Sequence, residues 1–208
     1  MLDLDEYLLD PCGTSSIPYW KALSVSVPSN MKILHHADFA AEAFHDYTDE
    51  PYFRLLHDLR QVPAPVLPSG YSVCKATLGE FAAHICSCYG SNCITEQQLL
   101  AYTKRPVYDE TLWLSVRCDK TGEIVATGIA ELDRTIGEAS LEWIQVSADH
   151  RRNGLGRYLA TELLQRLRHV ANFVTVSGQF NNPACPEALY RSCGFTGDDV
   201  WHILRKIG

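Results

Sequence analysis

The stretch VSADHRRNGLGRYLATELLQRL, residues 146–167, passes from an apolar run through a basic turn with two glycines into a helical pattern. From Leu155 onward, apolar residues recur at the three- and four-residue spacing of a helix with one buried face. The pattern predicts a helix that begins at residue 153 or 154 and ends near His169. The segment before the turn, residues 141–147, is rich in strand-forming residues and predicts a β-strand.

The start of this helix is suited to bind an anion. A helix N-terminus carries unpaired backbone N–H groups and the positive end of the helix dipole. Gly154 and Gly156 have no side chains, so an anion can approach the backbone closely. Arg151, Arg152 and Arg157 add positive charge. The sequence predicts a phosphate or pyrophosphate site here, with a tight turn that binds nothing as the alternative. Neither G-x-x-x-x-G-K-[ST] nor G-x-G-x-x-G is present at the turn.

Three blocks in order resemble one family. Residues 151–156, RRNGLG, fit the pattern [QR]-x-x-G-x-[GA], which is motif A of the GNAT superfamily of N-acetyltransferases. WIQVSADH, at 143–150, resembles the strand and acidic turn before that motif. NNPACPEALYRSCGF, at 181–195, resembles the family segment N-x-x-A-x-x-L-Y-x-x-x-G-F. The resemblance covers roughly residues 71–206.

The order of elements predicts an α/β (α+β) fold. The resemblance implies a GNAT-like mixed, mostly antiparallel central sheet flanked by helices, with an N-terminal extension. We expect two units: residues 1–68, an extension without a functional interpretation, and residues 69–208, the GNAT-like domain. In the extension the sequence predicts short helices at 4–10 and 17–23, a strand at 31–36, and a helical segment at 38–60 broken at Pro51. The Pro-rich stretch 62–70 is expected to be a linker.

Composition limits the partners. The chain has 208 residues and a formal net charge of −7, which disfavours binding to nucleic acid. The acidic start MLDLDEYLLD does not fit a signal peptide, and no apolar run reaches the ~20 residues of a membrane span. We therefore expect a cytoplasmic protein that binds a small-molecule or peptide amine, not a membrane or a nucleic acid; a homodimer stays open.

The 8 cysteines predict no metal site. Cys86, Cys88 and Cys93 lie together, but C-x-C-x4-C is not a common zinc spacing. Without a secretion signal we expect buried or half-exposed free thiols here. Cys185 and Cys193 flank the tyrosine segment and could be reactive.

The resemblance implies acetyl-coenzyme A as cosubstrate. Its pyrophosphate would lie on the turn formed by Arg151, Arg152, Asn153, Gly154, Leu155, Gly156 and Arg157. Its pantetheine arm would pair with the main chain near Ile144 and Val146, as an added strand does; plain core packing is the alternative for their side chains. Asn182 stands one residue away from the family's cofactor-binding asparagine, whose position Pro183 occupies here.

Three residues are candidates for catalysis. Tyr190 matches the tyrosine of the family's L-Y pair and could return a proton to the leaving thiolate; a packed core tyrosine is the alternative. Glu138 and Glu142 are candidate bases, with ordered water as the alternative. On an unbroken strand they would share one face with Ser140, Ile144 and Val146.

The resemblance therefore implies an N-acetyltransferase that moves an acetyl group from acetyl-coenzyme A to a primary amine, on a small molecule or a peptide N-terminus. A catalytically weak coenzyme A-binding or regulatory module is the alternative, and a sensor of nucleotide phosphates that uses the same anion site is a third.

Overall fold

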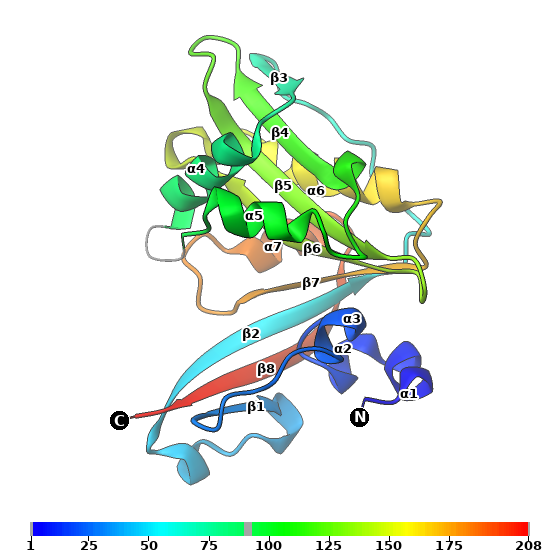
Figure 1. Ribbon diagram of the computed structural model, residues 1–208, viewed down its shortest axis with the longest axis vertical. Coiled ribbons are helices and arrows are strands. Elements are labelled where there is room, and N and C mark those ends of the chain that lie inside the picture. The colour runs from blue at the N-terminus through cyan, green and yellow to red at the C-terminus, as the bar shows by residue number, and fades with distance from the viewer. Residues whose placement is uncertain (1, 90–92, 208) are drawn as a thin grey trace.

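Eight strands form one continuous twisted sheet in the computed structural model, which describes residues 2–89 and 93–207 (Figure 1). Across the sheet the order is β1 (Met31–His35), β8 (Thr196–Lys206), β2 (Tyr47–His57), β7 (Phe173–Gln179), β6 (Glu138–Val146), β5 (Ile124–Asp133), β4 (Trp113–Cys118) and β3 (Tyr71–Cys74). All neighbouring strands are antiparallel except β6 and β7, which are parallel. The expected mixed, mostly antiparallel sheet is confirmed.

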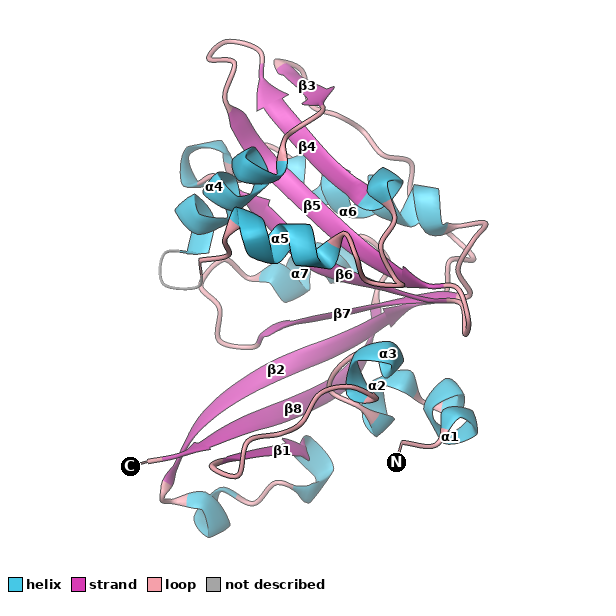
Figure 2. Ribbon diagram, in the orientation of Figure 1, coloured by secondary structure: helices cyan, strands magenta, loops and turns pink. Residues whose placement is uncertain are grey.

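Helices cover both faces of this sheet (Figure 2). One face carries α4 (Leu78–Tyr89), α5 (Glu96–Tyr102) and the short N-terminal helices α1 (Leu4–Leu9), α2 (Pro11–Thr14) and α3 (Tyr19–Ala22). The other face carries α6 (Leu155–Leu167) and α7 (Pro186–Ser192). Four 3-10 turns complete the set: His36–Asp38, Ala41–Phe44, Glu110–Leu112 and Ala148–His150. Within the described residues, no helix is both long and apolar enough to cross a membrane.

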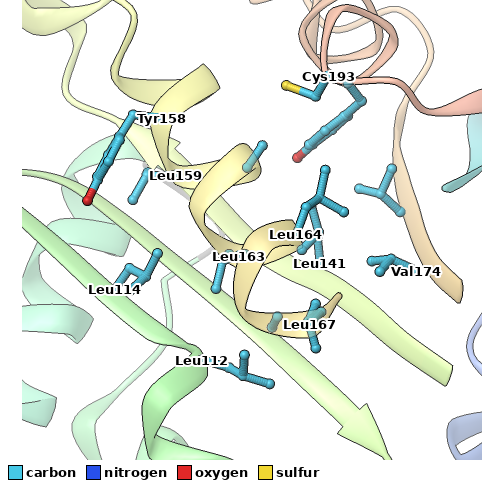
Figure 3. Packing of buried hydrophobic residues seen from close by; sticks show 14 of the residues in the cluster. Leu112, Leu114, Leu141, Tyr158, Leu159, Leu163, Leu164, Leu167, Val174 and Cys193 are labelled. Atoms are coloured by element: carbon cyan, nitrogen blue, oxygen red, sulfur yellow. The ribbon is translucent and has the colours of Figure 1, made fainter. Parts of the chain in front are cut away.

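The helix α6 has the buried face that its spacing predicts. Leu159, Leu163, Leu164 and Leu167 have no exposed surface. Leu164 lies beside Leu141 of β6 (Figure 3), whereas Leu159 and Leu163 lie over Gly128 of β5. Burial of each such leucine contributes about 1.5–3 kcal/mol to stability, less the entropy of ordering it. The helix thus fixes the turn before it against the centre of the sheet.

The predicted helical segment at 38–60 is wrong. Apart from Asp38, which ends one 3-10 turn, only the 3-10 turn Ala41–Phe44 is helical, and residues 47–57 form β2. This strand pairs with β7 on one side and with β8 on the other. The buried part of β2, from Phe53 to His57, is a short and mostly apolar run, which periodicity does not separate from a helix. Pro51 is tolerated because pairing with β7 begins only at Tyr52. The two-unit division at residue 68 stays a prediction, although β1 and β2 belong to the single sheet.

The strand β6 is broken by a bulge at Glu142. Ile129 and Ala130 of β5 pair with Trp143 and Leu141, so Glu142 is an extra residue between them. Side chains after the bulge therefore change face. Ile144 packs with the α6 core, where its Cδ1 lies 3.1 Å from the position a Cβ on Gly128 would take. The expectation that the alternate residues 138, 140, 142, 144 and 146 share one face of the sheet is wrong, because it assumed an unbroken strand.

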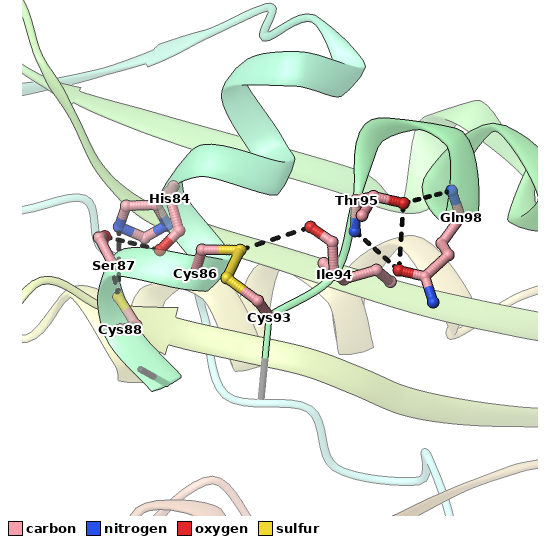
Figure 4. The surroundings of a disulfide bond; sticks show 8 residues. All are labelled: His84, Cys86, Ser87, Cys88, Cys93, Ile94, Thr95 and Gln98. Carbon is pink, nitrogen blue, oxygen red and sulfur yellow. Dashed lines mark hydrogen bonds between the residues drawn. A yellow bond between two sulfur atoms is a disulfide. The ribbon is translucent and has the colours of Figure 1, made fainter. Parts of the chain in front are cut away.

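Two cysteines expected to be free are joined. Cys86, near the end of α4, forms a disulfide with Cys93, with Cα atoms 4.5 Å apart (Figure 4). Ile94, the residue after Cys93, is buried in a cluster with Phe81, Ala82 and Ile85 of α4. The free cysteines are Cys12, Cys74, Cys88, Cys118, Cys185 and Cys193. Of the pair that flanks the tyrosine segment, Cys185 is exposed, whereas burial raises the pKa of the Cys193 thiol and makes it less reactive.

Candidate active site

The parallel strands β6 and β7 separate and leave one edge of β6 open. Their pairing runs from Glu138↔Phe173 to Leu141↔Val176 and then stops, while β6 continues to Val146. In Figure 1 the two strands lie together at one end and diverge towards α7. Residues 142–146 are still held by β5 on their other side. Within the described chain their backbone groups on the β7 side have no ladder partner, so an extended ligand could pair there. We call this opening the fork.

The turn at the end of β6 presents unpaired backbone N–H groups. Arg152 and Gly154 have φ of 64° and 84°, and residues 151–154 are exposed. Gly154 caps α6 without any side-chain acceptor. The N–H groups of the next three residues, 155–157, have no acceptor in the part of the chain that the structure describes. This is the arrangement that binds a phosphate at a helix start.

The arginines predicted around this turn have different partners. The Arg151 Nε donates to the Val146 carbonyl oxygen at 3.1 Å. The Arg157 guanidinium donates to the Ser192 carbonyl oxygen at 2.5 Å, so it ties α6 to the end of α7. Arg152 is exposed, and no hydrogen bond or ion pair of its guanidinium is found among residues 2–89 and 93–207. Arg152 is therefore the arginine best placed to meet an anion.

Other predicted cofactor residues have structural partners as well. The Asn153 amide donates to the Tyr71 hydroxyl at 3.3 Å, and that hydroxyl lies 3.0 Å from Nδ1 of His150. A Cβ on Gly156 would lie 3.1 Å from Cδ2 of Leu189, so glycine lets α7 approach α6. Asn182 accepts a hydrogen bond from the backbone N–H of Ala184 in the loop before α7. Their contacts with a cofactor stay predictions.

Tyr190 lies in the core beneath α7. Its side chain is 6% exposed, and its ring centroid lies 6.2 Å from that of Phe53 and 5.7 Å from that of Phe195. Burial raises the pKa of its phenol well above the ordinary value. The hydroxyl makes no hydrogen bond within the described residues, so it is a protonated group without a structural partner.

Glu138 is fully engaged by the N-terminal segment. It is 1% exposed and accepts hydrogen bonds from the Tyr7 hydroxyl at 2.6 Å and the Tyr19 backbone N–H at 2.9 Å. The Thr175 hydroxyl donates at 3.0 Å, and the Arg54 guanidinium lies 3.5 Å away. A carboxylate that is buried and faces so many donors is shielded from a substrate. Its geometry suits an anchor for residues 7–19 better than a base.

Glu142 and Glu131 lie near each other, and each carboxylate pairs with a cationic side chain. Glu142 accepts a hydrogen bond from Lys21 Nζ at 2.9 Å, and Glu131 one from Arg105 at 2.5 Å. Burial raises the pKa of Glu142, but Lys21 and the Ser140 hydroxyl outweigh it, so the pKa is lowered. Burial and the nearby Glu142 raise the pKa of Glu131 despite its cationic neighbours.

A cavity of about 120 Å³ opens where the fork begins. Its walls come from the segment that leads into α3 and from the facing parts of β6 and β7, and include Ile17, Lys21, Ser140, Glu142, Val176 and Ser177. Of the two predicted bases only Glu142 lines it. Lys21 and Arg54 were missed by sequence reasoning because their partners lie 38 or more residues away in the chain, and no local pattern records such contacts.

A larger hollow, of about 500 Å³, lies between α4 and the turn that joins β4 to β5. His84 lines it, with its ring nitrogens 2.9 Å from the Thr127 hydroxyl and 3.0 Å from the Ser147 hydroxyl. No group of three or more His, Cys, Asp or Glu side chains among the described residues is arranged to hold a metal ion.

The fork, the basic turn and the helix behind it define the class of protein. The sequence profile described as "Acetyltransferase (GNAT) family" matches residues 78–195, more than half of the chain. The chain belongs to this acetyltransferase family. The search of curated proteins gives no match.

Solved structures share the fold at low sequence identity. The GCN5-related N-acetyltransferase from Sphaerobacter thermophilus matches with a TM-score of 0.70 and 22% identity, over 86% of this chain and 61% of that one. The GNAT-family acetyltransferase from Colwellia psychrerythraea matches with a TM-score of 0.61 and 17% identity, over 90% and 69%. A tandem GNAT protein from the clavulanic acid biosynthesis pathway matches with a TM-score of 0.55 and 18% identity, over 81% and 57%. This chain thus spans less than two thirds of the length of the first of these proteins.

Proposed function

We propose that the chain is an N-acetyltransferase that moves an acetyl group from acetyl-coenzyme A to a primary amine. The observation that carries the proposal is the fork, whose open β6 edge leads directly to the unpaired N–H groups at the start of α6. An extended arm that ends in a pyrophosphate fits an open strand edge that is followed by an anion site.

The chain's own residues supply binding and proton transfer. The backbone of residues 142–146 would pair with the pantetheine arm, and the turn at 152–157 would hold the pyrophosphate. Acetyl-coenzyme A supplies the acetyl thioester. The amine nitrogen forms a bond to the acetyl carbon, the carbon–sulfur bond breaks, and the amine's proton leaves through Glu142 or water. Tyr190, kept protonated by burial, is the candidate to give a proton to the thiolate.

Substitution at Gly154 tests this assignment. Gly154→Asp puts a carboxylate next to the helix start and should weaken acetyl-coenzyme A binding by at least about 100-fold, as measured by calorimetry. Gly122→Asp is the matched control, because Gly122 also has a positive φ, 75°, but lies in the β4–β5 turn. Equal affinity of two folded variants would refute the placement of the pyrophosphate.

The alternative, a coenzyme A-binding module with weak turnover, is favoured by one observation. The N-terminal segment covers the amine side of the fork, since Ile17, Pro18 and Lys21 line its cavity. Release of free thiol from acetyl-coenzyme A with a mixture of primary amines distinguishes the two. Tight binding of acetyl-coenzyme A without amine-dependent thiol release would favour the module.

A further inference from the structure

Lys21 places an ammonium group at the entrance of the fork. Its Nζ lies 2.9 Å from Oε2 of Glu142 and 3.9 Å from Oε2 of Glu131. Lys21, Ser140 and Glu142 all line the cavity at the point where β6 and β7 part. A primary ammonium therefore already occupies the amine side of the proposed active site.

The site around this ammonium could hold a cation that lies closer to both carboxylates than Lys21 does. The Glu131 side chain is 4% exposed, and its Oε2 has no hydrogen-bond donor among the described residues. A buried carboxylate oxygen without a donor is costly, and Lys21 is too far away to hydrogen-bond to it. The Trp20 ring lies beside the same ammonium, 5.4 Å from Nζ to the ring centroid. An ammonium slightly deeper than Lys21 could contact both carboxylates and keep the aromatic wall.

The charges of the surrounding side chains indicate that the occupant carries one positive charge. Glu131 and Glu142 face Lys21 and Arg105, and Arg105 stays on Glu131 through its own hydrogen bond. When the Lys21 ammonium leaves, the four-residue cluster has one uncompensated negative charge. A single positive charge restores neutrality in a site that is partly shielded from water.

Lys21 can leave without unfolding its surroundings. Its side chain is 23% exposed, so rotation about its flexible stem carries the ammonium into solvent. The segment itself stays anchored, because the Tyr19 backbone N–H and the Tyr7 hydroxyl bond to Glu138 rather than to Glu142. Displacement therefore costs one ion pair that the incoming ammonium replaces.

We propose that the Lys21 ammonium occupies the position that the ammonium of the acceptor takes. The acceptor is a singly charged primary amine, whose ammonium displaces Lys21 between Glu142 and Glu131. This inference rests on the proposed function, because it assigns the amine side of the same fork. Lys21 then acts as a built-in competitor that weakens the binding of amines.

The test uses Lys21→Ala with butylammonium, a primary ammonium with the four-carbon chain of the lysine side chain. In thermal unfolding, butylammonium chloride should raise the Tm of Lys21→Ala clearly more than that of the parent or of Lys120→Ala, whose lysine lies in the exposed β4–β5 turn. Butanol should have no effect. Adding Glu142→Gln to Lys21→Ala should abolish the rise. No rise in folded Lys21→Ala would overturn the proposal.

Turnover gives a second measurement. With acetyl-coenzyme A, the KM for butylamine should be about 10-fold lower in Lys21→Ala than in the parent, because an intramolecular competitor is removed. An equal KM in the two proteins would overturn the inference while leaving acetyl transfer intact. Stabilisation by butylammonium in a protein that does not bind acetyl-coenzyme A would instead refute the proposed function and leave the ammonium site standing. If Lys21→Ala does not fold, Lys21→Met keeps the apolar stem, and methylammonium is the probe; no stabilisation of that variant would likewise count against the proposal.

Discussion

The ring of Tyr190 is packed in the core, but its hydroxyl makes no hydrogen bond to any described residue. Tyr190→Phe keeps the ring contacts with Phe53 and Phe195 and removes only the proton. We expect turnover to fall by about 10²–10⁴-fold, the usual contribution of a positioned general acid, with the Tm and the acetyl-coenzyme A affinity nearly unchanged. Amine-dependent thiol release and thermal unfolding measure the two quantities.

The control for this residue is Tyr158→Phe. Tyr158 is also buried, but it lies on α6, and its hydroxyl belongs to the side of the core that faces away from α7 (Figure 3). This variant should retain turnover. If Tyr190→Phe releases thiol at the parental rate and melts at a lower temperature, Tyr190 is a core residue and the catalytic assignment is wrong.

The part of the candidate site that sequence alone could predict is the part whose geometry is local. The turn at 151–156 needs only neighbouring backbone atoms and a following helix, so its short pattern predicts its geometry. Glu138 is different, because its partners Tyr7, Tyr19, Arg54 and Thr175 come from four distant parts of the chain. A strand carboxylate looks the same in sequence whether it faces solvent or such a network. Only the fold decides between a base and an anchor.

At the scale of elements, α6 and α7 meet at Gly156. Leu189 fills the space where a side chain at that position would lie, with 3.1 Å from its Cδ2 to the Cβ position. Gly156→Val should push α7 away, move Tyr190, and lower turnover by about 10²-fold or more, because small displacements of a positioned group are costly. Turnover and acetyl-coenzyme A affinity measured on the same preparation check this.

A compensating substitution at Leu189 tests whether Gly156→Val acts through the contact between α6 and α7. Leu189→Ala removes the group that the introduced valine side chain would strike, so adding it to Gly156→Val should restore most of the turnover. Leu189→Ala alone loses some packing and should lower the Tm modestly. If the double variant is as inactive as Gly156→Val, the glycine acts through the turn rather than through α7.

Two element-level predictions failed because residue spacing alone does not fix the structure. Periodicity assigns a face only if the backbone stays regular, and the bulge at Glu142 shifts every later side chain of β6 by one position. Periodicity also fails for β2, where the consecutive residues Phe53, Arg54 and Leu55 are all buried. By contrast, the amphipathic α6 appears where its pattern predicts it.

At the scale of the whole molecule, the N-terminal segment closes one side of the fork. Arg54 of β2 donates to the backbone carbonyl oxygens of Pro11 and Ser16, and Trp201 of β8 donates to that of Cys12. The segment is thereby fixed to strands on the far side of β7, while its tip reaches Glu138 and Glu142 on β6. The stability of this arrangement and the shape of the amine site are therefore linked.

Two buried histidines make the stability of the whole protein depend on pH. Burial lowers the pKa of His57, despite nearby Asp58 and the Cys193 backbone, and burial likewise lowers the pKa of His84. Each ring is neutral in the fold but takes up a proton in the unfolded chain below about pH 6.5. The stabilisation from their lowered pKa is thus present above that pH and is lost as the pH falls, by at most about 1.4 kcal/mol per pH unit for each histidine.

Urea unfolding between pH 7.5 and 5.5 measures this loss, and His84→Gln isolates one of its sources. The glutamine can still hydrogen-bond near Thr127 and Ser147 but takes up no proton, so the free energy of unfolding should fall less steeply with pH than in the parent. His169→Gln is the control, because His169 is exposed at the end of α6, and its slope should equal the parent's. The raised pKa of Glu131 acts in the opposite direction, since the folded state gains the proton first, but all three proteins share it. A His84→Gln slope identical to the parent's would mean that His84 keeps its ordinary proton affinity in the fold, and that its contacts with Thr127 and Ser147 hold the charged ring as well as the neutral one.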